Sequence, residues 1–160
     1  YGGQHADTSD DVSALWEKVK QKEKDGNKSV LSGVPQSLPS LIKAYRIQDK
    51  ARNVGFDWDE RGQVWDKVYE EIGELKAELE KGDKERSLKE LGDFIFSVVN
   101  AARLYHLNPD TALELTNRKF TNRFNFIERK AKELGKEISD MTLREMDELW
   151  EQAKTEQHDA

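Results

Sequence analysis

Two short acidic segments decide the fold and the chemistry: Glu70-Glu71-Ile72-Gly73-Glu74 and Glu90-Leu91-Gly92-Asp93. Each contains a pair of carboxylates three residues apart, Glu71 with Glu74 and Glu90 with Asp93, so both members of a pair lie on one side of a helix. Two such helices packed side by side would bring four carboxylates together. Like charges at short range repel unless cations lie between them. An all-oxygen ligand set suits a hard divalent cation, Mg²⁺ or Mn²⁺, rather than zinc or copper.

Apolar residues at helical spacing accompany both acid pairs. Residues 60–81 are expected to form one helix, with the stripe Trp65, Val68, Ile72, Leu75 and Leu79. Residues 84–105 are expected to form a second helix, whose apolar arc is so broad that we expect it to be central. That arc consists of Leu88, Leu91, Phe94, Ile95, Val98, Val99, Ala102 and Tyr105, with Phe96 widening it.

The two acid pairs have similar angular offsets from these stripes. At about 100° per residue, Glu71 and Glu74 lie about 80° and 140° from the stripe of their helix. Glu90 and Asp93 lie about 100° and 160° from theirs, on the same rotational side. The short turn at Gly82-Asp83 predicts antiparallel neighbouring helices, which is how helical bundles build metal sites.

The simpler interpretation is that these acids only solvate a helix surface, because the chain has 32 acidic residues. Asp93 weakens it, since we expect this side chain to be buried and a buried carboxylate needs a cation or a basic partner. The three histidines, His5, His106 and His158, form no Glu-x-x-His motif, which argues against a ferritin-like di-iron site.

The remaining segments complete an all-α bundle of about five helices. Further helices are expected at 39–53, at 109–134 and from the capping box Thr142-Leu143-Arg144-Glu145 onward. The helix at 109–134 is expected to turn inward Leu113, Phe120, Phe124, Ile127 and Ala131. The predicted compact helical domain covers residues 38–155. Residues 1–37 are predicted to be a polar arm or linker with one short helix over residues 13–24, and 156–160 a polar tail.

Composition narrows the class of protein. The 160 residues suffice for one domain, and a net charge of −6 argues against a nucleic acid polymer as partner. The absence of cysteine excludes disulfides, zinc-thiolate sites and thiol catalysis. The sequence shows no run of about 18 apolar residues and no signal peptide, so we expect no membrane partner and a cytoplasmic location.

A basic and aromatic group lies in the last two helices. Lys119 and Arg123 are four residues apart, and so are Trp150 and Lys154. The bases could bind phosphates that a metal leaves incompletely neutralised, Arg123 as a fork and Lys119 as a point charge. The alternatives are core packing for Trp150, a solvated helix end for Lys154 and an internal acid partner for Arg123.

These residues resemble the MazG-type nucleoside triphosphate pyrophosphohydrolases over about residues 10–155. The resemblance rests on Glu71-x-x-Glu74, Glu90-x-x-Asp93, Leu38-Pro39-Ser40-Leu41, Val54-Gly55-Phe56-Asp57-Trp58, Lys67-Val68-Tyr69-Glu70-Glu71 and Asn117-Arg118-Lys119-Phe120. It implies an all-α, dimeric fold and Mg²⁺-dependent hydrolysis of NTPs or dNTPs between the α- and β-phosphates, giving a monophosphate and pyrophosphate. The likeness is to the catalytic half of the longer members, since the acid signature occurs once here.

By this resemblance, Glu71, Glu74, Glu90 and Asp93 match the metal-ligand positions, and Lys119, Arg123, Trp150 and Lys154 the substrate contacts. Glu71 or Glu74 could orient or deprotonate the attacking water, and the sequence does not choose between them. Two alternatives stay open: a non-catalytic helical interaction domain with a solvated acidic face, and a pyrophosphatase narrowly selective for one dNTP. The breadth of the apolar arc on residues 84–105 predicts a homodimer, and Mn²⁺ is expected as a substitute for Mg²⁺.

Overall fold

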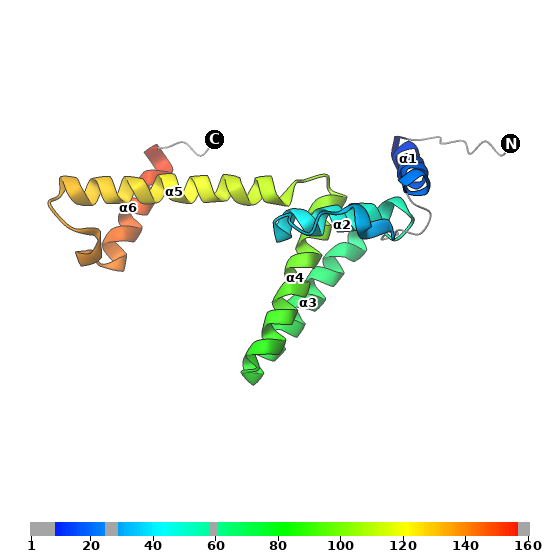
Figure 1. Ribbon diagram of the computed structural model, residues 1–160. Coiled ribbons are helices and arrows are strands. Elements are labelled where there is room, and N and C mark those ends of the chain that lie inside the picture. The colour runs from blue at the N-terminus through cyan, green and yellow to red at the C-terminus, as the bar shows by residue number, and fades with distance from the viewer. Residues whose placement is uncertain (1–8, 25–28, 58–60, 157–160) are drawn as a thin grey trace. The chain divides into compact units, whose positions relative to one another are not determined.

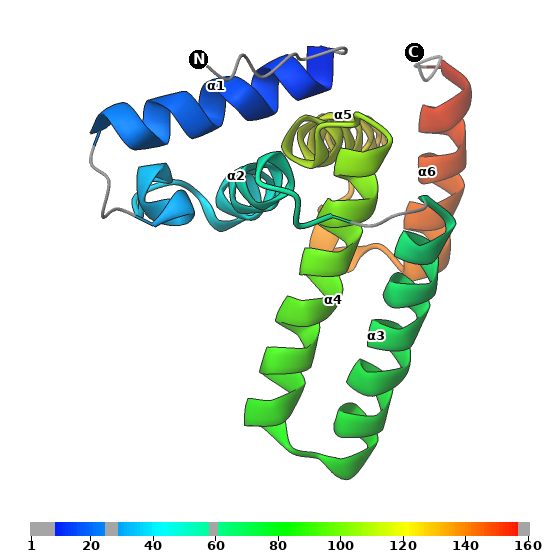
Figure 2. The same cartoon turned by 90° about the vertical axis from the view of Figure 1, so that its right-hand side faces the viewer.

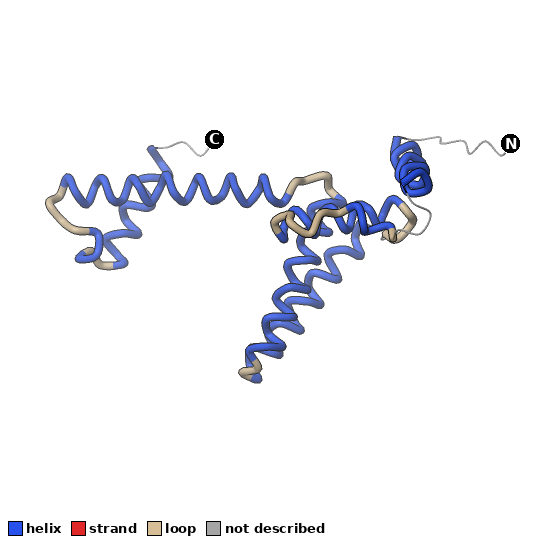
Figure 3. The backbone as a smooth tube through the Cα atoms, viewed as in Figure 1, coloured by secondary structure: helices blue, strands red, loops and turns tan. Residues whose placement is uncertain are grey.

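The computed structural model describes residues 9–24, 29–57 and 61–156, and the regular structure within these ranges is entirely helical (Figure 3). The α-helices are α1 (Ser9–Lys24), α2 (Ser40–Asn53), α3 (Arg61–Lys81), α4 (Lys84–Leu104), α5 (Pro109–Glu133) and α6 (Leu143–Glu156), as Figure 1 labels them. Two short 3₁₀ turns, Val30–Gly33 and Ile138–Asp140, precede α2 and α6. The all-α prediction is confirmed. Trp58 and residues 157–160 of the predicted tail lie outside the described residues.

The chain divides into two compact units, an N-terminal unit (Tyr1–Pro109) and a C-terminal unit (Asp110–Ala160). In the N-terminal unit, α3 and α4 form an antiparallel hairpin and lie side by side along their length (Figure 2). The turn needs the left-handed backbone of Gly82, whose φ is 74°, and Asp83 then caps α4 by accepting from the Arg86 backbone N–H at 3.0 Å. The hairpin thus places residues 71–74 opposite residues 90–93.

The core of the N-terminal unit lies at the open end of this hairpin. Val64, Val68 and Ala101 are buried there, and Ile72, Phe94 and Leu104 pack against them. Helix α2 packs on α4, where the buried Gln48 side chain donates from Nε2 to the Phe96 carbonyl at 2.9 Å. Helix α1 is joined to α2 by ion pairs from Lys50 to Glu17 and from Arg52 to Asp10.

The C-terminal unit packs α5 against α6 around Ile127, Ala131, Met141 and Leu149. The predicted capping box is confirmed: the Glu145 backbone N–H donates to Thr142 Oγ1 at 3.1 Å, and the Thr142 backbone N–H donates to Glu145 Oε1 at 3.4 Å. Within the described residues, no helix is both long and apolar enough to cross a membrane.

The burial of the apolar stripes departs from the sequence-based expectation. Five α4 side chains, Leu88, Leu91, Ile95, Phe96 and Val98, are 41–70% exposed. On α5, Leu113, Phe120 and Phe124 are exposed rather than inward, whereas Ile127 and Ala131 are buried. A helix can bury only the arc that its neighbours cover, and α4 presents apolar residues over a wider arc than α2 and α3 cover. Large exposed apolar areas of this kind are typical of association surfaces.

Candidate metal and phosphate site

Three of the four predicted carboxylates converge in the α3–α4 hairpin. Glu71 of α3 and Glu90 and Asp93 of α4 each offer one oxygen, and these oxygens all lie within 4.8 Å of one another. The convergence follows from the tight turn at residues 82–83, which makes α3 and α4 antiparallel, and from the matched offsets of the two acid pairs. The structure thus brings together one residue from the first pair and both residues from the second.

Burial within this acid cluster differs from the expectation. Glu71 is the buried member, at 5% exposure, and Asp93 is exposed. The prediction of a buried Asp93 was wrong because the face of α4 around residues 91–96 is not covered within this unit. The argument that a buried carboxylate needs a cation or a basic partner therefore applies to Glu71 and not to Asp93.

Two carboxylate oxygens in the cluster are buried and make no hydrogen bond within the described part of the chain. Oε2 of Glu71 and Oε2 of Glu90 are shielded from solvent and have no hydrogen-bond partner among the residues that the structure describes. A buried anionic oxygen without a partner is destabilising. Because these oxygens belong to a group of three converging carboxylates, the donor set fits a hard divalent cation such as Mg²⁺.

Glu74 lies outside the group of three and is exposed. Its pKa is raised above the ordinary glutamate value, first by the negative charge of Glu71, then by partial desolvation and by the charge of Glu90. The raised pKa shows that Glu74 shares the electrostatic field of the cluster. It can therefore act as a further ligand or as a group that orients water.

Lys67 is a contributor that the sequence analysis did not single out. Its Nζ lies 2.9 Å from Glu71 Oε1 and 3.5 Å from Glu70 Oε1. The hydrogen bond to Glu71 raises the pKa of Lys67, so the lysine stays charged. Lys67 contacts Oε1 of Glu71 and makes no hydrogen bond with Oε2 of the same carboxylate. The i, i+4 spacing of Lys67 and Glu71 was the available signal.

The basic and aromatic residues of the C-terminal unit form a second group. Arg123 is buried at 6% exposure, and its Cζ lies 5.2 Å from the centroid of the Trp150 ring. Phe120 packs on the same ring with centroids 5.4 Å apart. Lys119 is exposed on α5, and Lys154 pairs with Glu151 at 3.1 Å. The structure thus joins Arg123 to Trp150 and leaves Lys119 and Lys154 at the surface.

Comparison with known proteins shows what this sequence is similar to. Residues 63–127 match the model of the MazG nucleotide pyrophosphohydrolase domain. The chain is thus similar to MazG domains over these residues. The match includes all four predicted acidic positions together with Lys119 and Arg123, and it ends before Trp150 and Lys154. The prediction of a MazG-type chain is confirmed.

Similarity to curated proteins extends beyond the MazG domain. The chain is 39% identical over 158 residues to the nucleoside triphosphate pyrophosphohydrolase of Escherichia coli K12, covering 96% of this chain and 60% of the relative. It is 38% identical over 140 residues to the nucleoside triphosphate pyrophosphohydrolase/pyrophosphatase MazG of Thermotoga maritima, covering 87% and 54%. A Bacillus subtilis protein, YabN, is 47% identical over 146 residues, covering 90% and 30%. The chain therefore spans about 60% or less of the length of these relatives.

Proposed function

We propose that this chain is a Mg²⁺-dependent nucleoside triphosphate pyrophosphohydrolase that cleaves NTPs or dNTPs between the α- and β-phosphates. The carrying observation is the convergence of Glu71, Glu90 and Asp93 within a MazG domain, with two buried carboxylate oxygens that lack partners. The E. coli and T. maritima relatives, which are named as nucleoside triphosphate pyrophosphohydrolases, support the same activity. The products are a nucleoside monophosphate and pyrophosphate.

The roles follow from the contacts of each residue. Glu71, Glu90 and Asp93 would hold Mg²⁺, with Mn²⁺ as a substitute, and Lys67 fixes the rotamer of Glu71 through its 2.9 Å contact. The cation, when bound, supplies charge to phosphate oxygens and an acidified water. Glu74, the least committed of the four acids, orients that water.

Basic and aromatic residues of the C-terminal unit complete the assignment. Arg123 and Lys119 offset charge on the phosphates and on the pyrophosphate leaving group. Trp150 offers a ring for the base, and Lys154 supplies a further positive charge near it. The Arg123 guanidinium packs over the Trp150 ring. The two side chains together therefore offer a flat aromatic surface beside a positive charge.

Removal of a ligand tests the metal assignment. Glu71→Gln and Asp93→Asn should each lower kcat/KM by roughly 10³-fold, the scale of several kcal/mol of lost charge stabilisation. Glu80→Gln, an exposed acid on α3, is the matched control and should retain activity. The assay should separate monophosphate and pyrophosphate for every canonical NTP and dNTP. Wild-type rates in both ligand variants at saturating Mg²⁺ would overturn the assignment, and turnover of a single dNTP would establish the narrow alternative.

Thermal melting with Mg²⁺ separates an enzyme from a non-catalytic interaction domain. A cation that binds only the folded protein stabilises it by about 2.7 kcal/mol at one hundred times its dissociation constant. Mg²⁺ should therefore raise the Tm of the parent and of Glu80→Gln, and should raise that of Glu71→Gln much less. An unchanged parent Tm at every Mg²⁺ concentration would favour a solvated acidic surface.

We further propose that the active protein is a homodimer in which exposed apolar residues of α4 are buried. Five such residues, Leu88, Leu91, Ile95, Phe96 and Val98, lie within eleven positions of one helix. Leu88→Glu, at the most exposed of them, should weaken association by introducing a charge into an apolar contact. Light scattering at micromolar concentration checks this, and a stable, fully active monomer would refute it.

A further inference from the structure

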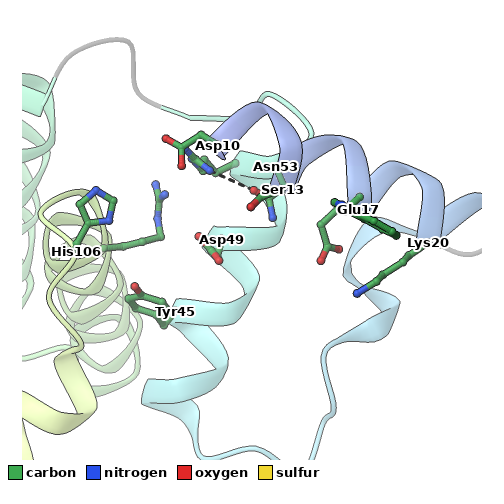
Figure 4. Close-up of a pocket in the computed structure, with 11 residues that line it drawn as sticks. Asp10, Ser13, Glu17, Lys20, Tyr45, Asp49, Asn53 and His106 are labelled. Atoms are coloured by element: carbon green, nitrogen blue, oxygen red, sulfur yellow. Dashed lines mark hydrogen bonds and ion pairs between the residues drawn. The ribbon is translucent and has the colours of Figure 1, made fainter. Parts of the chain in front are cut away.

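A cavity of about 500 Å³ lies within the N-terminal unit, between α1, α2 and the end of α4 (Figure 4). Its size is within the range of small-molecule sites. The walls include Trp16, Lys20, Tyr45, Asp49, Arg103 and His106. None of the acid-cluster residues lines it, so it is separate from the candidate metal site.

The backbone of His106 provides an observation independent of the cavity. Helix α4 ends with the Leu107 N–H donating to the Ala102 carbonyl and the His106 N–H donating to the Arg103 carbonyl. This motif places His106 at φ 57°, in the left-handed region. Helices α2 and α5 end with the same two hydrogen bonds, but there the left-handed residues are Gly55 and Gly135. A side chain that lines a cavity in spite of a strained backbone points to a function for that side chain.

Most of the charged side chains around the cavity have ion-pair partners. Arg103 pairs with Asp57 at 2.7 Å, and Arg52 pairs with Asp10 at 2.8 Å. Asp49 and Lys20 differ, because neither makes a hydrogen bond or ion pair with any residue that the structure describes. The cavity therefore retains one anionic acceptor and one cationic donor for a ligand.

Asp49 and Lys20 lie toward different ends of the cavity. Asp49, Tyr45 and His106 are on one side of the close-up, and Lys20 is on the other (Figure 4). A complementary ligand is elongated, with a planar donor-bearing ring at one end and an anion at the other. Carboxylates accept hydrogen bonds from the amino groups of bases, aromatic and histidine side chains stack on bases, and lysine binds phosphate.

We propose that this cavity is a second, non-catalytic site for a mononucleotide. The base lies against Tyr45 and His106 with its amino group on Asp49, and the phosphate is bound by Lys20. Trp16, which is 60% exposed in the cavity wall, becomes covered. The site would let the protein respond to monophosphates without occupying the acid cluster.

Binding is measured by calorimetry on the full chain carrying Asp93→Asn, in EDTA, with CMP, AMP, GMP and UMP. Without metal, the acid cluster repels a phosphate, and any binding at Arg123 and Trp150 is recognised because it persists in the cavity variants Asp49→Ala and Lys20→Ala. We expect one saturable site per chain, with UMP weakest because it lacks an amino group. Cytidine alone and inorganic phosphate alone should each bind at least tenfold more weakly than CMP.

Substitutions locate the site. Asp49→Ala and Lys20→Ala should each weaken CMP binding roughly tenfold or more, the scale of a hydrogen bond to a charged group. Lys76→Ala, an exposed lysine of α3, is the control and should bind as the parent does. Absence of saturable binding, equal binding in all variants, or tighter binding of the polycation spermidine than of CMP would overturn the proposal.

His106→Gly separates ligand contact from folding. Relief of the left-handed strain should raise the Tm by roughly 3 °C, while CMP binding weakens. The matched change Gly135→His, at the end of α5, should lower the Tm. A more stable His106→Gly protein with parental CMP affinity would contradict the role of His106. No readout here uses NTP hydrolysis, so this proposal and the catalytic one fail separately.

Discussion

Glu71 of the α3–α4 hairpin and Arg123 of α5 are almost equally buried, at 5% and 6% exposure, yet their charges are accommodated differently. The Arg123 guanidinium lies over the Trp150 ring, with Cζ 5.2 Å from the ring centroid. Glu71 has a partner on one oxygen only, Lys67, while the other is buried without one. One carboxylate oxygen of Glu90 and one of Asp93 lie within 4.8 Å of a Glu71 oxygen.

The difference lies in what surrounds each charge: an aromatic ring faces Arg123, whereas further carboxylates surround Glu71. A buried charge is tolerated when it is paired, and an unpaired one favours whatever supplies the missing counter-charge. Under the proposed function a cation supplies the counter-charge in the hairpin, whereas α5 and α6 bring Arg123 and Trp150 together within the C-terminal unit. Changes in the hairpin should act through metal binding, and changes in the C-terminal unit should act through substrate contacts and packing.

The largest expected effect in the C-terminal unit is that of Arg123→Ala, which should lower kcat/KM by roughly 10²-fold or more. The reason is the loss of a positioned charge that stabilises the developing negative charge of the leaving group. Steady-state kinetics with saturating Mg²⁺ measures it. Arg129→Ala is the matched control, because Arg129 also lies over an aromatic ring, 5.5 Å from Phe126, on the same helix. Equal losses in the two variants would show that Arg123 serves packing rather than substrate.

Trp150→Ala should have the next largest effect, since the ring is half-buried and packs against Phe120, Arg123 and the core of the unit. We expect a loss of about 2–3 kcal/mol in the free energy of unfolding, less than is typical of a fully buried Trp. Denaturant unfolding and kinetics on the same variant separate two roles. A raised KM with unchanged kcat in folded protein assigns the ring to the base, and an unchanged KM returns it to the core.

Local patterns predicted most of the fold. The capping box at residues 142–145 and the glycine-containing turn at residues 82–83 set helix ends that the structure confirms. These signals were sufficient because capping and turn geometry depend on neighbours in sequence. The burial of α4 was not predictable in the same way, because apolar spacing shows which face avoids water but not what covers it.

The acid cluster likewise shows what helical spacing can and cannot predict about a site. Helical spacing predicted that α3 and α4 would each contribute carboxylates, and Glu71, Glu90 and Asp93 do converge. Angular offsets could not show that Glu74 lies outside the group, because side-chain rotamers decide the last few ångströms. Nor could they show that Lys67 holds one oxygen of Glu71, since several lysines and acids on α3 have compatible spacing.

A smaller effect tests whether the C-terminal unit is organised by local interactions. Thr142→Ala removes the hydroxyl that accepts from the Glu145 backbone N–H, and should cost about 1 kcal/mol of unfolding free energy. Thr155→Ala is the control: its hydroxyl donates to the Glu151 carbonyl at an exposed position of the same helix, so the change should be within about 0.5 kcal/mol. Chemical denaturation measures both. Equal effects would mean that the cap adds nothing to the packing of α6.

The smallest expected effect is a dependence on acidity in the same capping box. A hydrogen bond from Lys136 at 2.7 Å, then one from the Thr142 backbone N–H, lowers the pKa of Glu145 below its ordinary value of 4.5. Because the folded pKa is lower than the unfolded one, the stabilisation is present above pH 4.5 and is lost as the pH falls through the folded value. Glu145→Gln should flatten this acid limb of the stability curve. Thermal melts of parent and variant between neutral and acid pH measure the difference, and superimposable acid limbs would show that Lys136 and Thr142 do not stabilise the ionised carboxylate.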